Sequence, residues 1–251
     1  MDYFKIDLRS INAGLHHQIG NFITIIKYCY LNNKKLIKPI FKLDKKHNLN
    51  IKRNIKTDLS GYININTIKV NNKPFKLYDD CDEIDFTVKR KKYKFGLIKY
   101  DELFVNMKDV KIEYEMVNNI IEIGKVISNK LGDYMCVHIR RGDKLKNPKM
   151  IEDTEPENIK KVIDKYDKNV VYLMTNKIQE IDRILELEKD KKIFFFYDFE
   201  ELKDIKDNYY LYCIELEIMK NASIRCSTFN TKKKDKNSQY HDYLTKFMGW
   251  Q

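Results

Sequence analysis

The second half of the chain alternates between short apolar runs and segments whose apolar residues recur at helical spacing. The apolar runs predict strands at 134–139, 169–174, 192–197 and 223–226, and the segments between them predict helices at about 155–167, 178–189 and 208–221. Strands that alternate with helices are typical of a parallel sheet. We therefore expect residues 132–251 to form an α/β lobe built on such a sheet.

The first half of the chain begins with the same alternation and then loses it. In chain order, the pattern predicts a strand at 3–8, a loop at 12–18, a helix at 18–32, a strand at 36–41, an edge strand at 62–66 and a helix at 113–131. Most of 42–110 is rich in Lys and Asn and gives weak signals. A boundary near residue 131 predicts two α/β lobes, 1–131 and 132–251, with a cleft between them.

Composition and charge narrow the class of protein. The chain has 251 residues, of which 43% are hydrophobic and 12% aromatic, so a disordered chain is excluded. Its net charge of +11 would attract nucleic acid, anionic membranes or phosphorylated small molecules. The Lys residues are spread over the whole chain, however, and neither zinc-finger spacing nor an RNA-recognition aromatic motif accompanies them. We therefore expect solvated surface Lys and no nucleic-acid partner.

The cysteines and the apolar runs favour a cytoplasmic location. The five Cys are irregularly spaced and form no CxxC motif, which predicts buried free thiols in a reducing compartment. No apolar run reaches the length of a membrane span, and the first residues lack the apolar core of a signal peptide. We therefore expect a cytoplasmic protein without a membrane span.

Polar residues follow three of the strands predicted in the second half. These stretches are 140–144, 175–176 and 227–231. Because the carboxyl ends of parallel strands share one edge of a sheet, we expect the three stretches to converge on one crevice. Arg140 and Arg141 carry planar, permanently charged guanidinium groups, which suit a diphosphate. Two other interpretations stay open: loops are polar in general, and an arginine here can form a structural salt bridge with Asp143.

Two patterns resemble metal sites more weakly. Asp80-Cys81-Asp82 has the form of a DxD metal motif, but it lies in an acidic run, which favours a solvated loop. His16 and His17 are adjacent, yet no Asp, Glu or Cys at useful spacing accompanies them. No P-loop, G-x-S-x-G or dinucleotide-binding fingerprint occurs in the sequence. We therefore predict no metal site.

Four stretches together carry a resemblance to a known family. His138-Ile139-Arg140-Arg141-Gly142-Asp143 resembles the signature of the GDP-fucose-dependent fucosyltransferases, which include α-1,2, α-1,6 and protein O-fucosyltransferases. Residues 14–18 and the helix after them are similar to the family's N-terminal Gly-Leu-Gly-Asn-Gln loop and helix. Residues 171–176 resemble the strand that follows the signature in the family. Residues 215–229 resemble its third motif, an acidic helix residue followed by a strand that ends in Ser/Cys-Thr-Phe-Ser.

The resemblance implies a GT-B-like fold, with two Rossmann-like lobes whose parallel sheets face a cleft. Residues 1–131 would form the acceptor side, and 132–251 would bind the GDP-sugar. The implied reaction is an inverting transfer of L-fucose from GDP-fucose to a glycan or protein hydroxyl, without a metal or another cofactor. Two alternatives stay open: a transferase that uses a different nucleotide sugar, and a non-enzymatic binder of nucleic acid or anionic glycans.

The resemblance also implies roles for individual residues. Arg140 would hold the β-phosphate and stabilise the departing GDP, and His138 would contact the nucleotide. Glu215 would accept hydrogen bonds from the guanine N1–H and N2 amine. Glu152 is the candidate general base, since inversion usually needs a carboxylate to take the acceptor's proton. The other donor-site candidates are Arg141, Asp143, Thr175, Asn176, Ser227, Thr228, Phe229 and Asn230, and those of the N-terminal loop are Gly14, His16, His17, Gln18 and Asn21.

Overall fold

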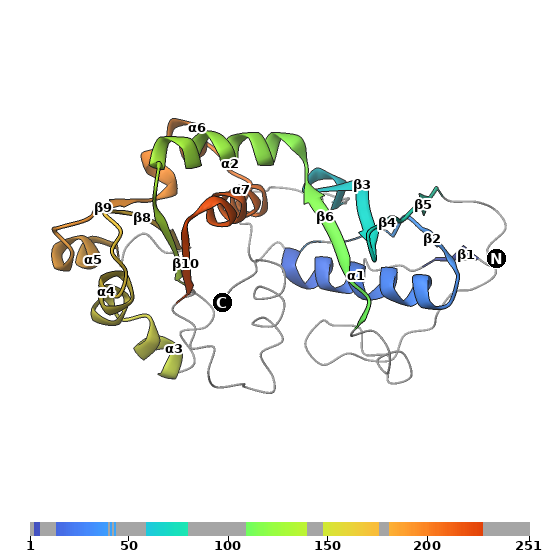
Figure 1. Cartoon of the computed structure of the whole chain (residues 1–251), viewed down its shortest axis with the longest axis horizontal. Helices are drawn as coiled ribbons and strands as arrows, with labels where there is room; N and C mark the ends of the chain where they lie inside the picture. The colour runs from blue at the N-terminus through green and yellow to red at the C-terminus, as the bar shows by residue number, and fades with distance from the viewer. Residues whose placement is uncertain are drawn as a thin grey trace. The chain divides into compact units, whose positions relative to one another are not determined.

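The chain divides into two compact units of α/β structure (Figure 1). The structure is a computed structural model that describes residues 3–5, 14–39, 41, 43, 59–79, 109–139, 148–175 and 181–227. The first unit comprises Met1–Ile120 with Lys206–Tyr210, and the second comprises Ile121–Ile205 with Leu211–Gln251. The first unit ends at Ile120, which lies inside helix α2 (Asn118–Leu131). The sequence pattern predicts the boundary later, at the end of this helix.

The first unit contains one parallel and one antiparallel sheet. The parallel sheet has the order β1-β2-β5, with strands Tyr3–Phe4, Lys35–Ile37 and Leu77–Tyr78. The antiparallel sheet has the order β4-β3-β6, with strands Lys73–Pro74, Ile63–Val70 and Ile112–Met116. Helix α1 (Leu15–Leu31) follows β1 in the chain, and a short 3-10 helix, η2 (Leu59–Gly61), precedes β3. The predicted strand–helix–strand start of the chain is therefore confirmed.

One face of α1 is buried in the first unit. Its buried residues recur mostly at intervals of three and four positions and are Leu15, Gln18, Ile19, Asn21, Phe22, Ile25, Ile26 and Cys29. The prediction of a loop at 12–18 is wrong from Leu15 onward, because Leu15 lies four positions before Ile19 and extends the buried stripe by one turn. The helix therefore starts earlier than its most regular apolar spacing indicates.

Two predictions for the antiparallel sheet are wrong. Strand β3 is not an edge strand, because β4 and β6 pair with it on its two sides. The helix predicted at 113–131 begins later, because its first residues belong to β6, which pairs with β3 from Ile112 to Met116. Exposed and less exposed residues alternate along β6, which is the two-residue period of a strand. A partner strand about 45 positions earlier in the chain thus decides the structure of this segment.

The second unit is built on a four-stranded parallel sheet of order β10-β7-β8-β9. Its strands are β7 (Met135–Ile139), β8 (Val170–Thr175), β9 (Lys192–Phe194) and β10 (Ile224–Ser227). After α2, the helices in chain order are α3 (Pro148–Asp153), α4 (Pro156–Asp164), α5 (Ile181–Leu187), the 3-10 helix η6 (Phe196–Asp198), α6 (Glu200–Lys203) and α7 (Asn208–Asn221). The strands and long helices predicted for this half are present, which confirms the parallel α/β class, but the predicted strand 192–197 is wrong at its end, because Phe196–Asp198 form η6.

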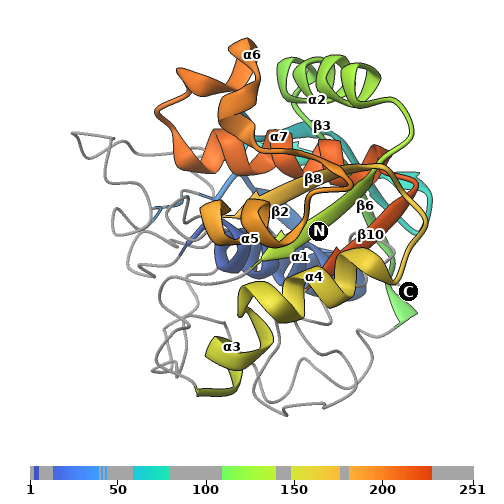
Figure 2. The same cartoon turned by 90° about the vertical axis from the view of Figure 1, so that its left-hand side faces the viewer.

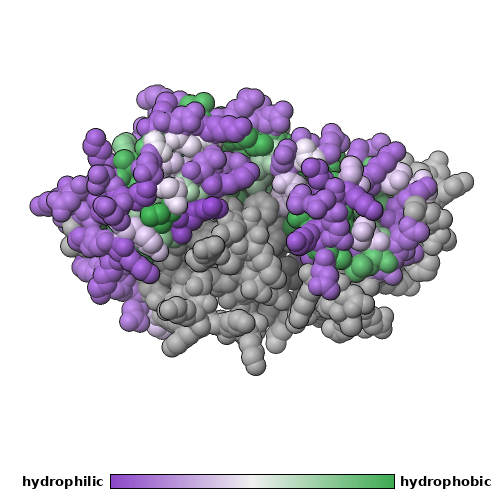
Figure 3. Space-filling view, in the orientation of Figure 1, coloured by the Kyte–Doolittle hydropathy of each residue, from purple (hydrophilic) through white to green (hydrophobic). Residues whose placement is uncertain are grey.

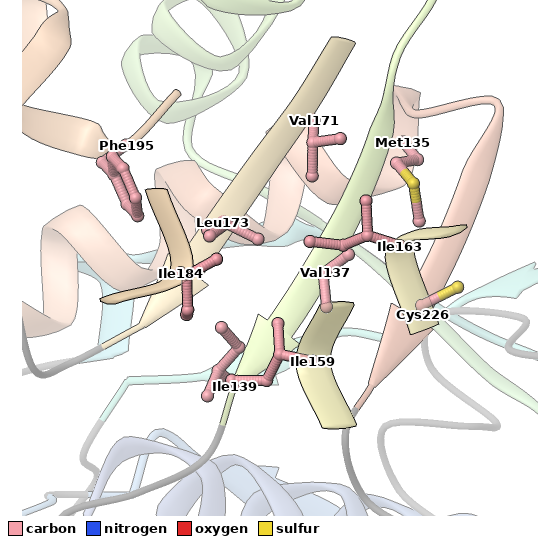
Figure 4. Close-up of a cluster of buried hydrophobic side chains, with 10 residues drawn as sticks. All are labelled: Met135, Val137, Ile139, Ile159, Ile163, Val171, Leu173, Ile184, Phe195 and Cys226. Carbon is pink, nitrogen blue, oxygen red and sulfur yellow. The ribbon is translucent and has the colours of Figure 1, made fainter. Parts of the chain in front are cut away.

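Helices cover both faces of the sheet in the second unit (Figure 2). Helices α4 and α5 cover one face, where a buried apolar cluster joins them to alternate residues of β7 and β8 (Figure 4). The cluster consists of Met135, Val137, Ile139, Ile159, Ile163, Val171, Leu173, Ile184, Phe195 and Cys226. Helix α7 covers the opposite face, and α2 lies on the same side (Figure 2). Because side chains alternate along a strand, Cys136, His138 and Tyr172 point to the α7 face.

Helices α2 and α7 approach each other closely at Gly124. A Cβ atom added to Gly124 would lie 2.6 Å from the Cβ of Glu217 on α7, which is closer than side chains tolerate. One turn later on α2, the Ser128 hydroxyl donates to the Gly124 carbonyl at 2.7 Å and lies 2.9 Å from the Tyr134 hydroxyl. That hydroxyl donates to the backbone carbonyl of Ile218 on α7. Gly124 thus lets the two helices approach closely, and the hydrogen bonds of Ser128 and Tyr134 connect them.

Candidate functional site

The strand order of the second unit reverses between β7 and β10. From β7 the chain proceeds to β8 and β9 on one side, and it returns through α7 to β10 on the other side. In open α/β sheets, ligands bind outside the carboxyl ends of the strands at such a reversal, because the loops on its two sides lead to opposite faces. The carboxyl ends of β7 and β10 are therefore the candidate site of this unit.

Three of the predicted site residues meet at this edge of the sheet. His138 pairs in register with Ser227 of β10 and with Met174 of β8, and Thr175 pairs with Ile139. His138 is buried and Thr175 is half-buried. The carboxyl ends of β10, β7 and β8 therefore lie side by side, and the convergence of the polar stretches 140–144, 175–176 and 227–231 on one crevice stays a prediction.

Most of the predicted site residues beyond the strand ends lie outside the described residues. They are Arg140, Arg141, Asp143, Asn176, Thr228, Phe229 and Asn230, and the same is true of Asp80-Cys81-Asp82. In the sequence, Arg140 comes directly after Ile139, the last residue of β7. The contacts of these residues with a nucleotide diphosphate stay predictions.

Glu215 lies inside the second unit, on the α7 face of the sheet. It is only 6% exposed, and its Oε1 accepts a 3.0 Å hydrogen bond from the Tyr172 hydroxyl. Burial raises the pKa of Glu215 to about 8, and the hydrogen bond from Tyr172 opposes that rise. Glu215 therefore holds a proton at neutral pH unless a ligand favours its ionised form. Burial also raises the pKa of the neighbouring Cys136 thiol, and Glu215 adds to that rise.

The sequence pattern does not single out Tyr172, the partner of Glu215. It stands in the apolar run Val170–Met174, where a tyrosine is most simply taken as one more core residue. The residue it contacts lies 43 positions later in the chain. What could have pointed to this contact is the hydroxyl of Tyr172 within the otherwise apolar run Val170–Met174, because a buried hydroxyl needs a hydrogen-bonding partner.

Glu152 lies on a short helix. No helix is predicted between the strand 134–139 and the helix at about 155–167, yet 148–153 form α3, with Pro148 at the first helical position, where proline is favoured. The backbone carbonyl of Glu152 accepts a 2.7 Å hydrogen bond from the side-chain amide of Asn158 on α4. The Glu152 side chain is exposed, and its role as a general base stays a prediction.

The N-terminal candidates gather at the start of α1, in the first unit. Gly14 is the N-cap residue, and its carbonyl accepts a 3.1 Å hydrogen bond from the backbone N–H of Gln18. Gln18 and Asn21 are buried on the face of α1 that packs into the unit. His16 and His17 lie in the first turn of the helix. The predicted N-terminal loop is thus mostly the beginning of a helix.

The described residues also bear on metal, membrane and disulfide chemistry. Among them, no three His, Cys, Asp or Glu side chains form a group that could hold a metal ion. Within the same part of the chain, no helix is both long enough and apolar enough to cross a bilayer. Where Figure 3 is coloured by hydropathy, the visible residues are mostly hydrophilic, with small apolar patches. Cys29, Cys136, Cys213 and Cys226 are buried free thiols, as predicted, and Cys81 lies outside the described residues.

The architecture is GT-B-like, a mixed α/β fold with parallel sheets that is shared with fucosyltransferases of known structure. The chain is similar to NodZ α-1,6-fucosyltransferase soaked with GDP-fucose, with a TM-score of 0.55 and 11% identity over 92% of this chain and 90% of that chain. It is also similar to fucosyltransferase NodZ from Bradyrhizobium, with a TM-score of 0.52 and 12% identity over 92% of this chain and 91% of that chain. No protein-family model and no curated protein matches the sequence. Similarity at this identity shows the fold alone, and it confirms the predicted fold class.

Proposed function

We propose that this chain is a glycosyltransferase that moves L-fucose from GDP-fucose to a hydroxyl of a glycan or protein, with inversion at the anomeric carbon. The observation that carries the proposal is the reversal of strand order between β7 and β10, because His138 and Ile139, which end β7, also begin the segment that resembles the fucosyltransferase signature, 138–143. The similarity of the fold to a fucosyltransferase soaked with GDP-fucose supports the same class of donor.

The leaving group sets the main chemical requirement of this reaction. The acceptor oxygen attacks the anomeric carbon while the bond from that carbon to the β-phosphate oxygen breaks, so negative charge builds on the departing GDP. Arg140, the residue after β7, would hold that phosphate through its permanently charged guanidinium group and stabilise the charge as it develops. Glu152 would take the proton of the acceptor hydroxyl. The proposal includes no metal ion and no further cofactor.

Recognition of the base is assigned to Glu215 and predicts a pH dependence. Guanine offers adjacent N–H donors at N1 and at the N2 amine, and an ionised carboxylate can accept from both. Because burial raises the pKa of Glu215 to about 8, the free protein carries this carboxyl protonated at neutral pH, and GDP binding releases the proton. GDP affinity should therefore rise as the pH approaches 8. Isothermal titrations in two buffers of different ionisation enthalpy measure both affinity and proton release, and an affinity that falls with rising pH contradicts the assignment.

Calorimetric titration of GDP tests the proposed site directly. Wild type is expected to bind GDP, and Arg140→Ala to lose roughly tenfold or more in affinity, since it removes a charge-assisted contact with the diphosphate. Arg183→Ala is the matched control, because Arg183 pairs with Glu157 on the exposed surface of the same unit. It is expected to bind GDP like wild type. Absence of GDP binding by wild type, or unchanged binding by Arg140→Ala, refutes the proposal.

A donor panel separates this function from its alternative. GDP-fucose, other GDP-sugars and UDP-sugars are each incubated with the enzyme, with and without EDTA, and release of the nucleotide is measured. Turnover of GDP-fucose that persists in EDTA is the expected result. Turnover of a UDP-sugar without turnover of GDP-fucose would assign a different nucleotide sugar to the same fold.

A further inference from the structure

The Tyr172 side chain is fixed in the interior of the second unit. It stands on β8, between β7 and β9, and is fully buried on the face covered by α7. Its ring lies 6.2 Å, centre to centre, from the ring of Phe199, which limits how the ring can turn. With the ring held in this way, the hydroxyl points to the α7 face, where it meets the Glu215 carboxyl at 3.0 Å.

The hydroxyl of Tyr172 is not explained by packing. A phenylalanine would fill nearly the same volume of core without placing a polar group there, and a buried hydroxyl is unfavourable unless it is hydrogen-bonded. The hydroxyl donates to a side chain that can ionise, whereas the equally buried Tyr134 donates to a backbone carbonyl of the same helix, at Ile218. Tyr134 therefore connects the residue before β7 to α7 structurally, and Tyr172 acts on one carboxyl group.

Tyr172 influences both the ionisation and the orientation of the Glu215 carboxyl. Among the described residues, Cys136 and Tyr134 are the other titratable groups that interact with the Tyr172–Glu215 pair, and burial raises the pKa of both so that they stay neutral. Burial favours the protonated form of Glu215, and the hydrogen bond from Tyr172 is the interaction that opposes it. The hydrogen bond also restricts the rotation of the carboxyl group, since the donor is itself fixed.

We propose that Tyr172 is a positioning residue for base recognition, whose hydroxyl holds the Glu215 carboxyl in the orientation that accepts two N–H groups of a guanine base. The inference rests on the proposed function, because it assumes that Glu215 meets the base of a GDP-sugar. Tyr172 uses one lone pair of Oε1, which leaves Oε2 and the second lone pair of Oε1 for the base. The residue acts through Glu215 and does not itself contact the substrate.

Titrations with GDP and with inosine diphosphate test this role. Inosine diphosphate keeps the diphosphate and the base N1–H but lacks the N2 amine. Wild type is expected to prefer GDP, and Tyr172→Phe is expected to lose roughly tenfold in GDP affinity and most of that preference. Inorganic pyrophosphate, which has no base, should bind both proteins equally. The pH at which GDP affinity reaches its maximum should be higher for Tyr172→Phe than for wild type, since Glu215 then loses the contact that favours its ionised form.

Two further variants distinguish positioning from a general loss of structure. In a Glu215→Gln background, adding Tyr172→Phe should change the preference for GDP much less than it does in wild type, because the two residues act as one unit. Tyr134→Phe removes an equally buried hydroxyl that bonds to the same helix, and it should lower stability while leaving the preference for GDP unchanged. An unchanged preference in folded Tyr172→Phe, or the same loss in Tyr134→Phe, overturns the inference. Failure of wild type to bind GDP would instead refute the proposed function.

Discussion

At the scale of single residues, burial changes what Glu215 can do. In the sequence it is an acidic residue on a helix, and an exposed carboxyl of this kind is ionised at neutral pH. In the fold it is buried against Tyr172 and keeps its proton up to a pH of about 8. Groups with strongly shifted pKa values often occur at functional sites, and this one lies in the unit that carries the strand reversal.

Replacement of Glu215 by glutamine is expected to stabilise the protein at high pH. In the unfolded chain this carboxyl loses its proton near its ordinary pKa of 4.5, whereas in the folded chain it keeps the proton up to about 8. The unfolding free energy of wild type should therefore fall as the pH rises between these values, by about 5 kcal/mol at most. Glu215→Gln should remove this loss. Urea unfolding at the two ends of this pH range measures the difference.

The control for this experiment is Glu186→Gln. Glu186 is exposed on α5 of the same unit, so its replacement should change stability little at either end of the pH range. An equal effect of the two substitutions, or a Glu215→Gln protein that is less stable than wild type at high pH, would show that the Glu215 carboxyl is not held protonated by the fold.

The buried cysteines are expected to be unreactive in the folded protein. Burial raises the pKa of Cys29 to about 12 and also raises those of Cys136 and Cys226, so little nucleophilic thiolate forms near neutral pH. Alkylation by iodoacetamide, followed peptide by peptide with mass spectrometry, should be far slower at these positions in native protein than in urea. Fast labelling of any of the three in the native protein would contradict their burial.

At the scale of elements, repeated spacing predicts strands and helices well where one face is buried. Strand β7 and helix α7 lie where the apolar pattern places them. The predictions fail where pairing with a distant strand determines the structure of a segment. Residues 113–116 have a spacing that also fits a helix, and they form a strand because β3 pairs with them. Strand β3 has an alternating pattern typical of an edge, and it is central because β4 and β6 pair with it on both sides.

Substitution of Gly124 by alanine tests the packing of α2 on α7. Alanine favours a helix by about 1 kcal/mol over glycine, but its Cβ would lie 2.6 Å from the Glu217 Cβ, which cannot move without the backbone of α7. Overpacking typically costs about 1–3 kcal/mol, so a net loss of roughly 1 kcal/mol in unfolding free energy is expected. Val126→Ala, at an exposed position of α2, is the control and should change stability little. Stabilisation by Gly124→Ala would show that the helices do not approach closely there.

At the scale of the whole molecule, each of the two units is built from two separate stretches of the sequence. Lys206–Tyr210 belong to the first unit although they lie late in the chain, and most of α2 belongs to the second unit although it precedes the predicted boundary at 131/132. The reason is packing: α2 contacts α7 through Gly124, and its Ser128 hydroxyl meets that of Tyr134. A break in sequence pattern marks the end of an element, which need not be the end of a unit.

Two fragments test where the second unit begins. A fragment of residues 117–251 keeps α2 complete, whereas a fragment of 132–251 loses it. The longer fragment should be the more stable in urea, because the shorter one exposes the face of α7 that packs on α2. Far-UV circular dichroism and urea unfolding compare the two. Equal stability would show that α2 contributes little to the second unit and would place the boundary after this helix.

The sequence by itself determined the α/β class, the parallel character of the second sheet, and which residues follow the strand ends. These depend on local spacing, since the period of apolar residues and the position of a polar stretch can be read within about ten residues. Tertiary structure decided that β10 lies beside β7, that β3 is a central strand, and that the Tyr172 hydroxyl meets Glu215. Each of these is a contact between segments far apart in the chain, and local spacing carries no information about which distant partner a buried group will meet.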